Sequence, residues 1–337
     1  SDFFASAHPY MQLVMNPLAK GVGVNHSDND LYFVPKQETL GDFNKDYGDE
    51  LYFIERRPSE EQVNYKGYRR TIDKNGKVTD MESTTDMLEK IKEDEEYIVD
   101  QRAYVRARVF DMLVGDWDRH QDQWRWIEYE GERGIKEFMP IPRDRDNIFP
   151  RFDGFALKLI KMFVPNSRRW QTFDEDIDDV NWLNLSGSKL DKVLVTDLGA
   201  ESWVEEAKYI QKNLTEQEIE EAFQRLPLEV QDSVSGFIKK SLKARLKQLD
   251  QWALEYGAYL NKVVIVRGTE KDDKFEFTRE ANGKTTVVVK RILTDEPNPE
   301  IYRRILDKST TKEIWVYGLG DDDVYGGSSS YYSIFIF

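Results

Sequence analysis

Apolar residues recur along the chain with two different periods. Over residues 99–114 they return at helical spacing, which predicts a helix with one apolar face, and residues 201–257 have a strongly helical pattern as well. Residues 30–37 and 49–56, and the chain from 261 onward, read instead as strands. We therefore expect an α+β protein.

Local signals mark the ends of several of these elements. Ser83 with Asp86, and Thr215 with Glu218, have the spacing of a capping box at a helix start. The "KNGK" at 74–77 suits a tight turn between strands. Together the patterns divide the chain into three parts. They are an N-terminal α/β part (1–100), a central region with a helical layer (101–260), and a β-rich end (261–337).

Composition narrows the class of protein. The chain has 337 residues and is 39% hydrophobic, which is enough for a globular core. Its formal charge of -15 argues against nucleic acid as a main partner, because the phosphate backbone would be repelled. The absence of Cys excludes disulfides and thiolate metal sites. The longest apolar runs, such as 263–266, are far too short for a transmembrane helix.

Two dense charged motifs flank one predicted hairpin. "GDWDRHQDQWRW" covers residues 115–126, and "IPRDRDNIF" covers 141–149. Phosphoryl transfer needs a carboxylate near the attacking hydroxyl and oxygen ligands for Mg²⁺, which prefers carboxylates. Protein kinases place a catalytic Asp in a loop, an Asn five positions later, and a metal-binding Asp after a hairpin. Here Asp118 is followed five positions later by Gln123, and Asp144 comes after the hairpin.

These motifs resemble those of atypical kinases. "GDWDRHQDQW" is similar to the catalytic loops of phosphoinositide kinases, secretory-pathway casein kinases, HipA and the spore-coat CotH kinases, and "IPRDRDNIF" is similar to the P-W-D-L-D of the CotH kinases. The resemblance implies an atypical protein-kinase-like fold with a helical C-terminal layer and a β-rich end, and it makes the central part, 101–260, the kinase-like catalytic-loop region. It also implies phosphoryl transfer from ATP with Mg²⁺ or Mn²⁺.

A longer resemblance covers most of the chain. Segments such as "SAHPY" (6–10), "ERRP" (55–58), "LTEQEIEEAF" and "EIWVYGLGDDD" (313–323) resemble a region of large Bacteroidota proteins. Those proteins join a calcineurin-like metallophosphoesterase to this region and to a BamA/TamA-type surface-antigen barrel. The resemblance implies an extracytoplasmic location, in the periplasm or at the cell surface, with an outer-membrane complex or barrel as partner.

The kinase resemblance assigns roles residue by residue. Asp118 would be the general base. Asp144, with Asp146 as the competing choice, would hold the metal. Gln123 takes the place of the second metal ligand, where the kinase pattern has Asn, and its longer side chain would place the carbonyl differently.

The same resemblance assigns supporting and nucleotide-binding residues. Arg119 and His120 would brace the loop, as the Arg and His of the H-R-D motif do. A strand Lys with a Gly-rich phosphate loop is missing upstream of residue 100. Lys36 and Glu55 are the nearest substitutes for nucleotide contacts.

A structural interpretation competes with the catalytic one. The acids could belong to a buried ion network with neighbouring arginines, and the tryptophans could simply be core, since buried Asp must be paired or metal-bound. The chain would then be a catalytically inactive, pseudokinase-like scaffold of an outer-membrane assembly or secretion complex. A metal-dependent phosphohydrolase is a weaker alternative, because no His lies near "RDRD". The arginines in question are Arg119, Arg125, Arg143 and Arg145.

The segment "YGLGDDD" at 317–323 resembles the Gly/Asp turns of calcium-binding β-rolls. Asp321 and Asp323 would be the Ca²⁺ ligands. Such turns bind Ca²⁺ by stacking successive repeats, and a single copy is more often a tight turn between strands. The residues after it predict at most an edge strand.

Overall fold

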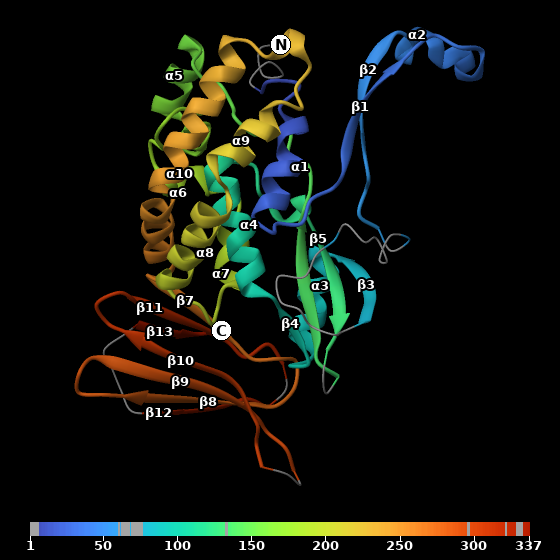
Figure 1. Ribbon diagram of the computed structural model, residues 1–337. Helices are drawn as coiled ribbons and strands as arrows, with labels where there is room; N and C mark the ends of the chain where they lie inside the picture. Colours follow the sequence, from blue (N-terminus) through green and yellow to red (C-terminus); the bar gives the residue numbers. More distant parts are fainter. Residues whose placement is uncertain are drawn as a thin grey trace.

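The computed structural model mixes helices and strands throughout, which confirms the predicted α+β class. Figure 1 shows a helical body, a sheet packed beside it, a two-stranded hairpin that projects away, and a β-rich C-terminal part below. None of the helices among the described residues combines the length and apolarity that crossing a bilayer requires. The structure describes residues 7–59, 61, 68, 77–131, 134–294, 297–320, 322–327 and 333–337.

Five helices form the body. The longest, α10, packs against α8 and α4, and α1 packs against α9. The helical pattern predicted over 201–257 is confirmed, with breaks that separate α8, α9 and α10. The five are α1 (Gln12–Gly21), α4 (Gln101–Val114), α8 (Ala200–Asn213), α9 (Glu216–Phe223) and α10 (Ser233–Leu260). The shorter helices are α2 (Asn44–Tyr47), α3 (Thr84–Glu93), α5 (Phe155–Phe163), α6 (Val180–Leu183) and α7 (Ser188–Leu194).

Helix α4 lies at the centre of the body and is buried on every side from Ala103 onward. The sequence predicted this helix correctly, but not the burial of two of its arginines. Instead, Arg108 is fully buried, and its Nε donates to Asp191 of α7 at 2.8 Å. Arg106 is buried as well, and its Nε donates to Glu206 of α8 at 2.7 Å. Partners on neighbouring helices therefore allow α4 to carry charge inside the core.

The predicted helix starts are confirmed. Ser83 accepts a hydrogen bond from the backbone N–H of Asp86 at 3.2 Å and caps α3. Thr215 and Glu218 form a complete capping box at the start of α9. Three residues of the turn predicted at 74–77 lie outside the described residues.

The sheet beside the body has the strand order β3-β5-β6-β4. Strands β5 and β6 form the antiparallel hairpin that the sequence predicted, with Trp124 opposite Pro142. This register places the start of β5 next to the end of β6, so the segments 115–123 and 143–149 lie side by side. The strands are β3 (Lys77–Ser83), β4 (Tyr97–Val99), β5 (Trp124–Glu130) and β6 (Lys136–Pro142).

The N-terminal hairpin consists of β1 (Asn29–Val34) and β2 (Glu50–Glu55), which pair antiparallel. Asn29 lies opposite Glu55, so Glu55 is at the end of the hairpin that joins the body. The opposite end carries the turn with α2 and projects away from the body (Figure 1). A two-stranded ribbon of this kind gains little stability by itself.

The C-terminal strands form two sheets with a separate apolar core. Their orders are β10-β9-β8-β12 and β13-β11-β7, and β13 is the edge strand that the sequence predicted near the end of the chain. The strands are β7 (Val263–Arg267), β8 (Asp273–Arg279), β9 (Lys284–Arg291), β10 (Glu300–Asp307), β11 (Glu313–Tyr317), β12 (Val324–Gly327) and β13 (Ser333–Ile336).

Candidate active site

The first charged motif begins where α4 ends. Gly115 adopts a left-handed conformation, with φ of 72°, and reverses the chain. A Cβ at this position would also lie 3.0 Å from the ring of Phe173, so Gly is favoured on two grounds. The backbone N–H of Asp116 then donates to the carbonyl of Asp111 at 2.9 Å. The loop is thus attached to the last turn of α4 without an intervening linker.

Arg119 fixes the loop against the segment that follows β6. It is almost completely buried, and its Nη1 donates to the carbonyl of Arg143 at 2.7 Å. Its Nη2 donates to the carbonyl of Gln123 at 3.0 Å. The guanidinium also lies over the ring of Trp124, 4.7 Å from the centroid. These contacts hold the loop against the segment that follows β6.

A buried ion network holds both segments on α4. Its centre is Asp111, which is fully buried and accepts from Nη2 of Arg145 at 2.8 Å. Nε of Arg119 and Nη1 of Arg108 each lie 3.3 Å from Oδ2 of Asp111. A buried ion network therefore exists with two of the four arginines considered from the sequence, Arg119 and Arg145. At its centre is an acid from α4 that the motif analysis missed. A lone Asp in an otherwise apolar stretch of helix was the available signal.

The network also includes Asp116. This residue is buried, and Nη1 of Arg119 lies 3.5 Å from its Oδ2. Burial raises the pKa of Asp116 to about 7, because the Arg119 charge offsets only part of the desolvation and Asp111 adds repulsion. Trp124 and Trp126 are fully buried, as the structural interpretation predicted for them.

Four other acids remain outside this network. Asp118 is half-buried, and the remaining three reach solvent. Among the residues that the structure describes, none of the four has an ion pair with Lys, Arg or His. The four are Glu55, Asp118, Asp144 and Asp146.

The four acids lie close enough to affect one another's ionisation. Partial burial raises the pKa of Asp146 to about 6, and the charges of Asp144, Asp118 and Glu55 raise it further. Partial burial also raises the pKa of Glu55, to which the charge of Asp144 contributes. The end of β2, the loop after α4 and the segment after β6 thus bring their acids into one negative site.

Gln123 and Asp144 are in direct contact. The side-chain N–H of Gln123 donates to Oδ2 of Asp144 at 3.2 Å. Asp144 has a positive φ of 53°, a backbone conformation that costs free energy in residues other than Gly. His120 lies beside them, with its Nε2 3.4 Å from the side-chain nitrogen of Gln123. The other ring nitrogen of His120 accepts from the backbone N–H of Asp122 at 3.3 Å and caps the short turn Gln121–Gln123.

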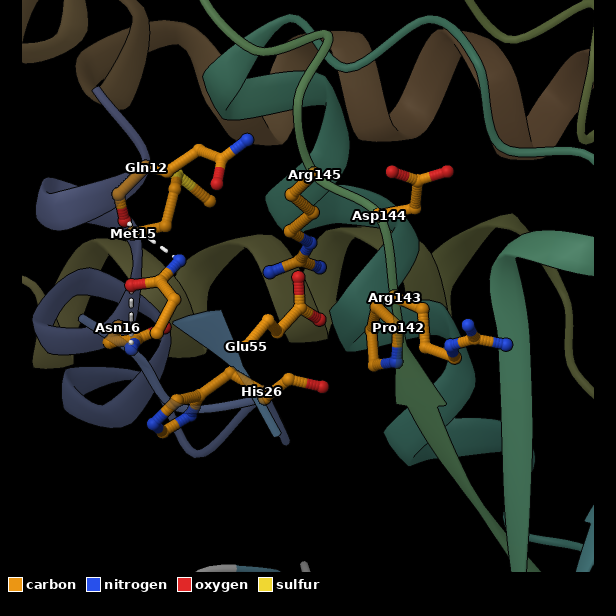
Figure 2. Close-up of a pocket in the computed structure, with 11 residues that line it drawn as sticks. Gln12, Met15, Asn16, His26, Glu55, Pro142, Arg143, Asp144 and Arg145 are labelled. Carbon is orange, nitrogen blue, oxygen red and sulfur yellow. Dashed lines mark hydrogen bonds between the residues drawn. The ribbon is translucent and has the colours of Figure 1, made fainter. Parts of the chain in front are cut away.

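A small cavity lies beside these residues, between α1, β2 and the segment after β6 (Figure 2). Glu55 points into it toward the guanidinium of Arg145, whereas Asp144 and Arg143 point away from it. Nε and Nη1 of Arg145 are buried and have no hydrogen-bond partner among the described residues. The cavity therefore joins the buried network to the acids at the surface.

Lys36 does not belong to this site. Its Nζ pairs with Asp49 at 3.1 Å, and 61% of its side chain is exposed. Glu55 lies opposite Asn29, at the start of β1, whereas Lys36 follows the end of β1. At the rise per residue of a β-strand, the length of chain from Asn29 to Lys36 is about 20 Å. The structure brings Glu55 to the acids and leaves Lys36 at the far end of the hairpin.

A metal site has few donors here. Among the described residues, no group of three or more His, Cys, Asp or Glu side chains is placed to hold a metal ion. Mg²⁺ commonly uses only one or two protein carboxylates and completes its shell with water and phosphate oxygens. Asp144 and Asp146 supply such oxygens without competing ion pairs, and Gln123 supplies an amide next to them. Carboxylate and amide oxygens are the kind of ligand that a hard divalent cation prefers.

The suggested calcium turn cannot be described as a whole, because Asp321 lies outside the described residues. Asp323 accepts from the backbone N–H of Asp273 at 3.0 Å and from the hydroxyl of Tyr325 at 3.3 Å. These contacts hold the start of β12 against β8.

No protein-family model and no curated protein matches the chain. Among solved structures, the chain is similar to HipA in the HipA, HipB and operator DNA complex of the Shewanella oneidensis MR-1 toxin-antitoxin system. The two chains are 14% identical with a TM-score of 0.38, and the match covers 72% of this chain and 56% of that chain. It is also similar to CtkA, a proinflammatory kinase of Helicobacter pylori, with 11% identity and a TM-score of 0.37 over 75% of this chain and 81% of that chain. The chain thus spans little more than half of HipA.

Proposed function

We propose that the chain is an atypical kinase-like domain that transfers a phosphoryl group from ATP to a hydroxyl, with Mg²⁺ or Mn²⁺. The observation that supports this most is the group of acids without ion pairs beside a rigidly held loop. Burial raises the pKa of Asp146, and repulsion from the neighbouring acids raises it further, so a bound cation would stabilise the ionised site. A solely structural network would have used these acids to pair with arginines, as Asp111 and Asp116 do.

Asp118 is the proposed general base. Its backbone N–H donates to Oδ1 of Asp116 at 3.4 Å, while its carboxylate has no ion pair among the described residues. The carboxylate can therefore accept a hydroxyl proton without first breaking a salt bridge. Arg119 is a positioning residue, because it holds the end of the loop at Gln123 and joins the loop to Arg143 in the segment after β6.

Asp144 and Asp146 are the proposed metal ligands, with the amide oxygen of Gln123 as a third. A bound Mg²⁺ would neutralise charge on the phosphate oxygens. The hydrogen bond from Gln123 to Asp144 keeps the two side chains together before any metal binds. Glu55 adds negative charge at the edge of the site.

A catalytically inactive, pseudokinase-like scaffold is the second candidate. The position of Lys36 supports it, because the one Lys suggested for nucleotide contacts is paired with Asp49 at the far end of the hairpin. In this alternative the buried network on α4 would serve folding, and the surface would bind a partner in an outer-membrane assembly.

Ligand binding distinguishes the two candidates. We would measure thermal unfolding of the wild type, Asp144→Ala and the exposed control Asp42→Ala, with Mg²⁺ or Mn²⁺ and with or without ATP. A ligand at 100 times its Kd stabilises the folded state by about 2.7 kcal/mol. We expect a metal-dependent ATP shift in the wild type and the control that is lost in Asp144→Ala. No shift with either metal would refute the kinase proposal and favour the scaffold.

Turnover tests the base separately. Formation of ADP and of phosphorylated product should fall at least about 100-fold in Asp118→Asn, while the ATP-induced thermal shift stays. Equal turnover in Asp118→Asn and the wild type would remove Asp118 from the mechanism.

We also propose an extracytoplasmic location, in the periplasm or at the cell surface, in association with an outer-membrane complex or barrel. The sequence resemblance to Bacteroidota proteins with a metallophosphoesterase and a surface-antigen barrel is the support for this. Cell fractionation with an antibody to the chain should recover it with the outer membrane. Recovery in the cytoplasm would refute the proposal.

A further inference from the structure

A second cavity, of about 350 Å³, lies between the body and the C-terminal strands. One side is formed by β4 and the first turn of α4, and the other by the end of β7 and by β10. Its volume is in the usual range for small-molecule sites. Tyr97, Ile98, Leu198, Ile301 and Tyr302 give it apolar walls.

Two sets of contacts hold the cavity open. On one side Nη2 of Arg291, at the end of β9, lies 2.5 Å from a carboxylate oxygen of Glu95 in the body. On the other side Nη1 of Arg304, from β10, donates to the carbonyl of Thr196 at 2.5 Å, and Nη2 donates to Asn261 at 2.6 Å. The walls are therefore tied together at both edges, with the cavity between them.

Arg267 lines this cavity and has unused hydrogen-bond donors. Among the described residues, its guanidinium has no hydrogen bond and no ion pair. Burial lowers its pKa to about 10, and the charge of Asp197 opposes this shift only in part. A guanidinium has five N–H donors, and Arg267 lines the cavity only partly exposed, so a ligand inside could accept hydrogen bonds from it.

The acids around the cavity are already engaged. Asp197 accepts from the side-chain N–H of Gln101 at 2.9 Å. Asp100 accepts from the backbone N–H of Ala103 at 2.9 Å and caps α4. Glu95 is paired with Arg291, and Glu137 also has an interaction partner.

The other arginine of the cavity is engaged as well. Arg102 pairs with Glu205 at 2.6 Å and with Glu206 at 3.1 Å. Among the described residues that line the cavity, Arg267 is therefore the arginine whose N–H donors have no protein partner.

We propose that this cavity binds a small organic anion, whose carboxylate or phosphate oxygens are held by Arg267. The apolar walls would contact the body of the ligand, and the guanidinium would orient its charged end. Because β4 and α4 lie on one side and β7 and β10 on the other, the ligand would join the body to the C-terminal strands. The proposal does not depend on phosphoryl transfer at Asp118.

Titration calorimetry with inorganic phosphate and with succinate tests the proposal. The variants are Arg267→Gln, the surface control Arg303→Gln, which removes the same charge from a side chain that is 53% exposed, and Asp197→Asn. We expect the wild type and the control to bind at least one anion equally. Arg267→Gln should bind at least tenfold more weakly, and Asp197→Asn more tightly, because a carboxylate that faces the guanidinium is removed.

Two results would overturn the proposal. One is that the wild type binds neither anion, and the other is that Arg267→Gln binds as tightly as the wild type. Circular dichroism of Arg267→Gln, and partial recovery of binding in Arg267→Lys, separate loss of the site from loss of folding. Asp144→Ala should bind the anion as the wild type does, which separates this cavity from the proposed active site.

Discussion

Asp111 and Asp118 lie seven residues apart on opposite sides of Gly115, and we predict contrasting effects when each is changed to Asn. Asp111→Asn removes the charge that Arg119 and Arg145 share inside the core. Asp118→Asn removes a carboxylate that has no ion pair among the described residues and that adds repulsion to Asp146. The first change should destabilise the fold, and the second should leave it nearly intact.

The magnitudes follow from burial. Removing one partner of a buried ion pair lowers the free energy of unfolding by about 3–5 kcal/mol. A substitution away from such contacts changes it by no more than about 0.5 kcal/mol. At about 2.1 cal/mol/K per residue, 337 residues that unfold together have an unfolding entropy of about 0.7 kcal/mol/K. Asp111→Asn should therefore lower the Tm by about 4–7 °C, and Asp118→Asn should change it by less than about 1 °C.

Thermal unfolding followed by circular dichroism measures both variants under one buffer and one scan rate. If Asp118→Asn lowered the Tm as much as Asp111→Asn, Asp118 would belong to the structural network, and its assignment as a base would fail. If Asp111→Asn had no effect, the network on α4 would not contribute to stability as its burial requires.

Three further predictions concern ionisation and packing. In an NMR titration, Asp144→Asn should lower the pKa of Asp146 from about 6 toward its ordinary range, and an unchanged pKa would contradict the proposed clustering. Because burial raises the pKa of Asp116 to about 7, the folded state binds more protons than the unfolded state between pH of about 4 and 7. The free energy of unfolding should therefore fall as pH rises through this window, and less so in Asp116→Asn, as chemical denaturation at several pH values would show. In α10, a Cβ at Gly257 would lie 2.9 Å from the backbone of α8, so Gly257→Ala should cost about 1–3 kcal/mol. Gly236→Ala, in the same helix with no atom within 4 Å of the added Cβ, should stabilise by about 0.5–1 kcal/mol when both are measured by denaturation.

The elements with local signals could be predicted from the sequence. The spacing of apolar residues is sufficient for α4, and the capping residues Ser83 and Thr215 fix the starts of α3 and α9. The burial of Arg108 could not be predicted in this way. Its partner Asp191 lies 83 residues later in the chain, and only the packing of α7 against α4 brings the two together.

The candidate site was predictable in part for a similar reason. Asp118 and Asp144 flank a hairpin, and antiparallel pairing brings the two ends of a hairpin together whatever the rest of the fold does. Lys36 and Glu55 belong to the two halves of one hairpin, but they are not opposite each other, because Glu55 pairs with Asn29 and Lys36 follows the end of β1. The structure does not bring these two suggested nucleotide contacts together, because Glu55 lies at the end joined to the body and Lys36 follows the opposite end.

The last turn of α4 carries both segments of the candidate site. The backbone N–H of Asp116 donates to Asp111, and that of Phe149 donates to the carbonyl of Val114 at 2.9 Å. Neither segment can open without breaking bonds to a helix that lies in the core. The amide hydrogens of Asp116 and Phe149 should therefore exchange with solvent as slowly as those of the core helices, whereas surface loops exchange quickly. Entry and exit of any ligand would then depend on motions of other segments.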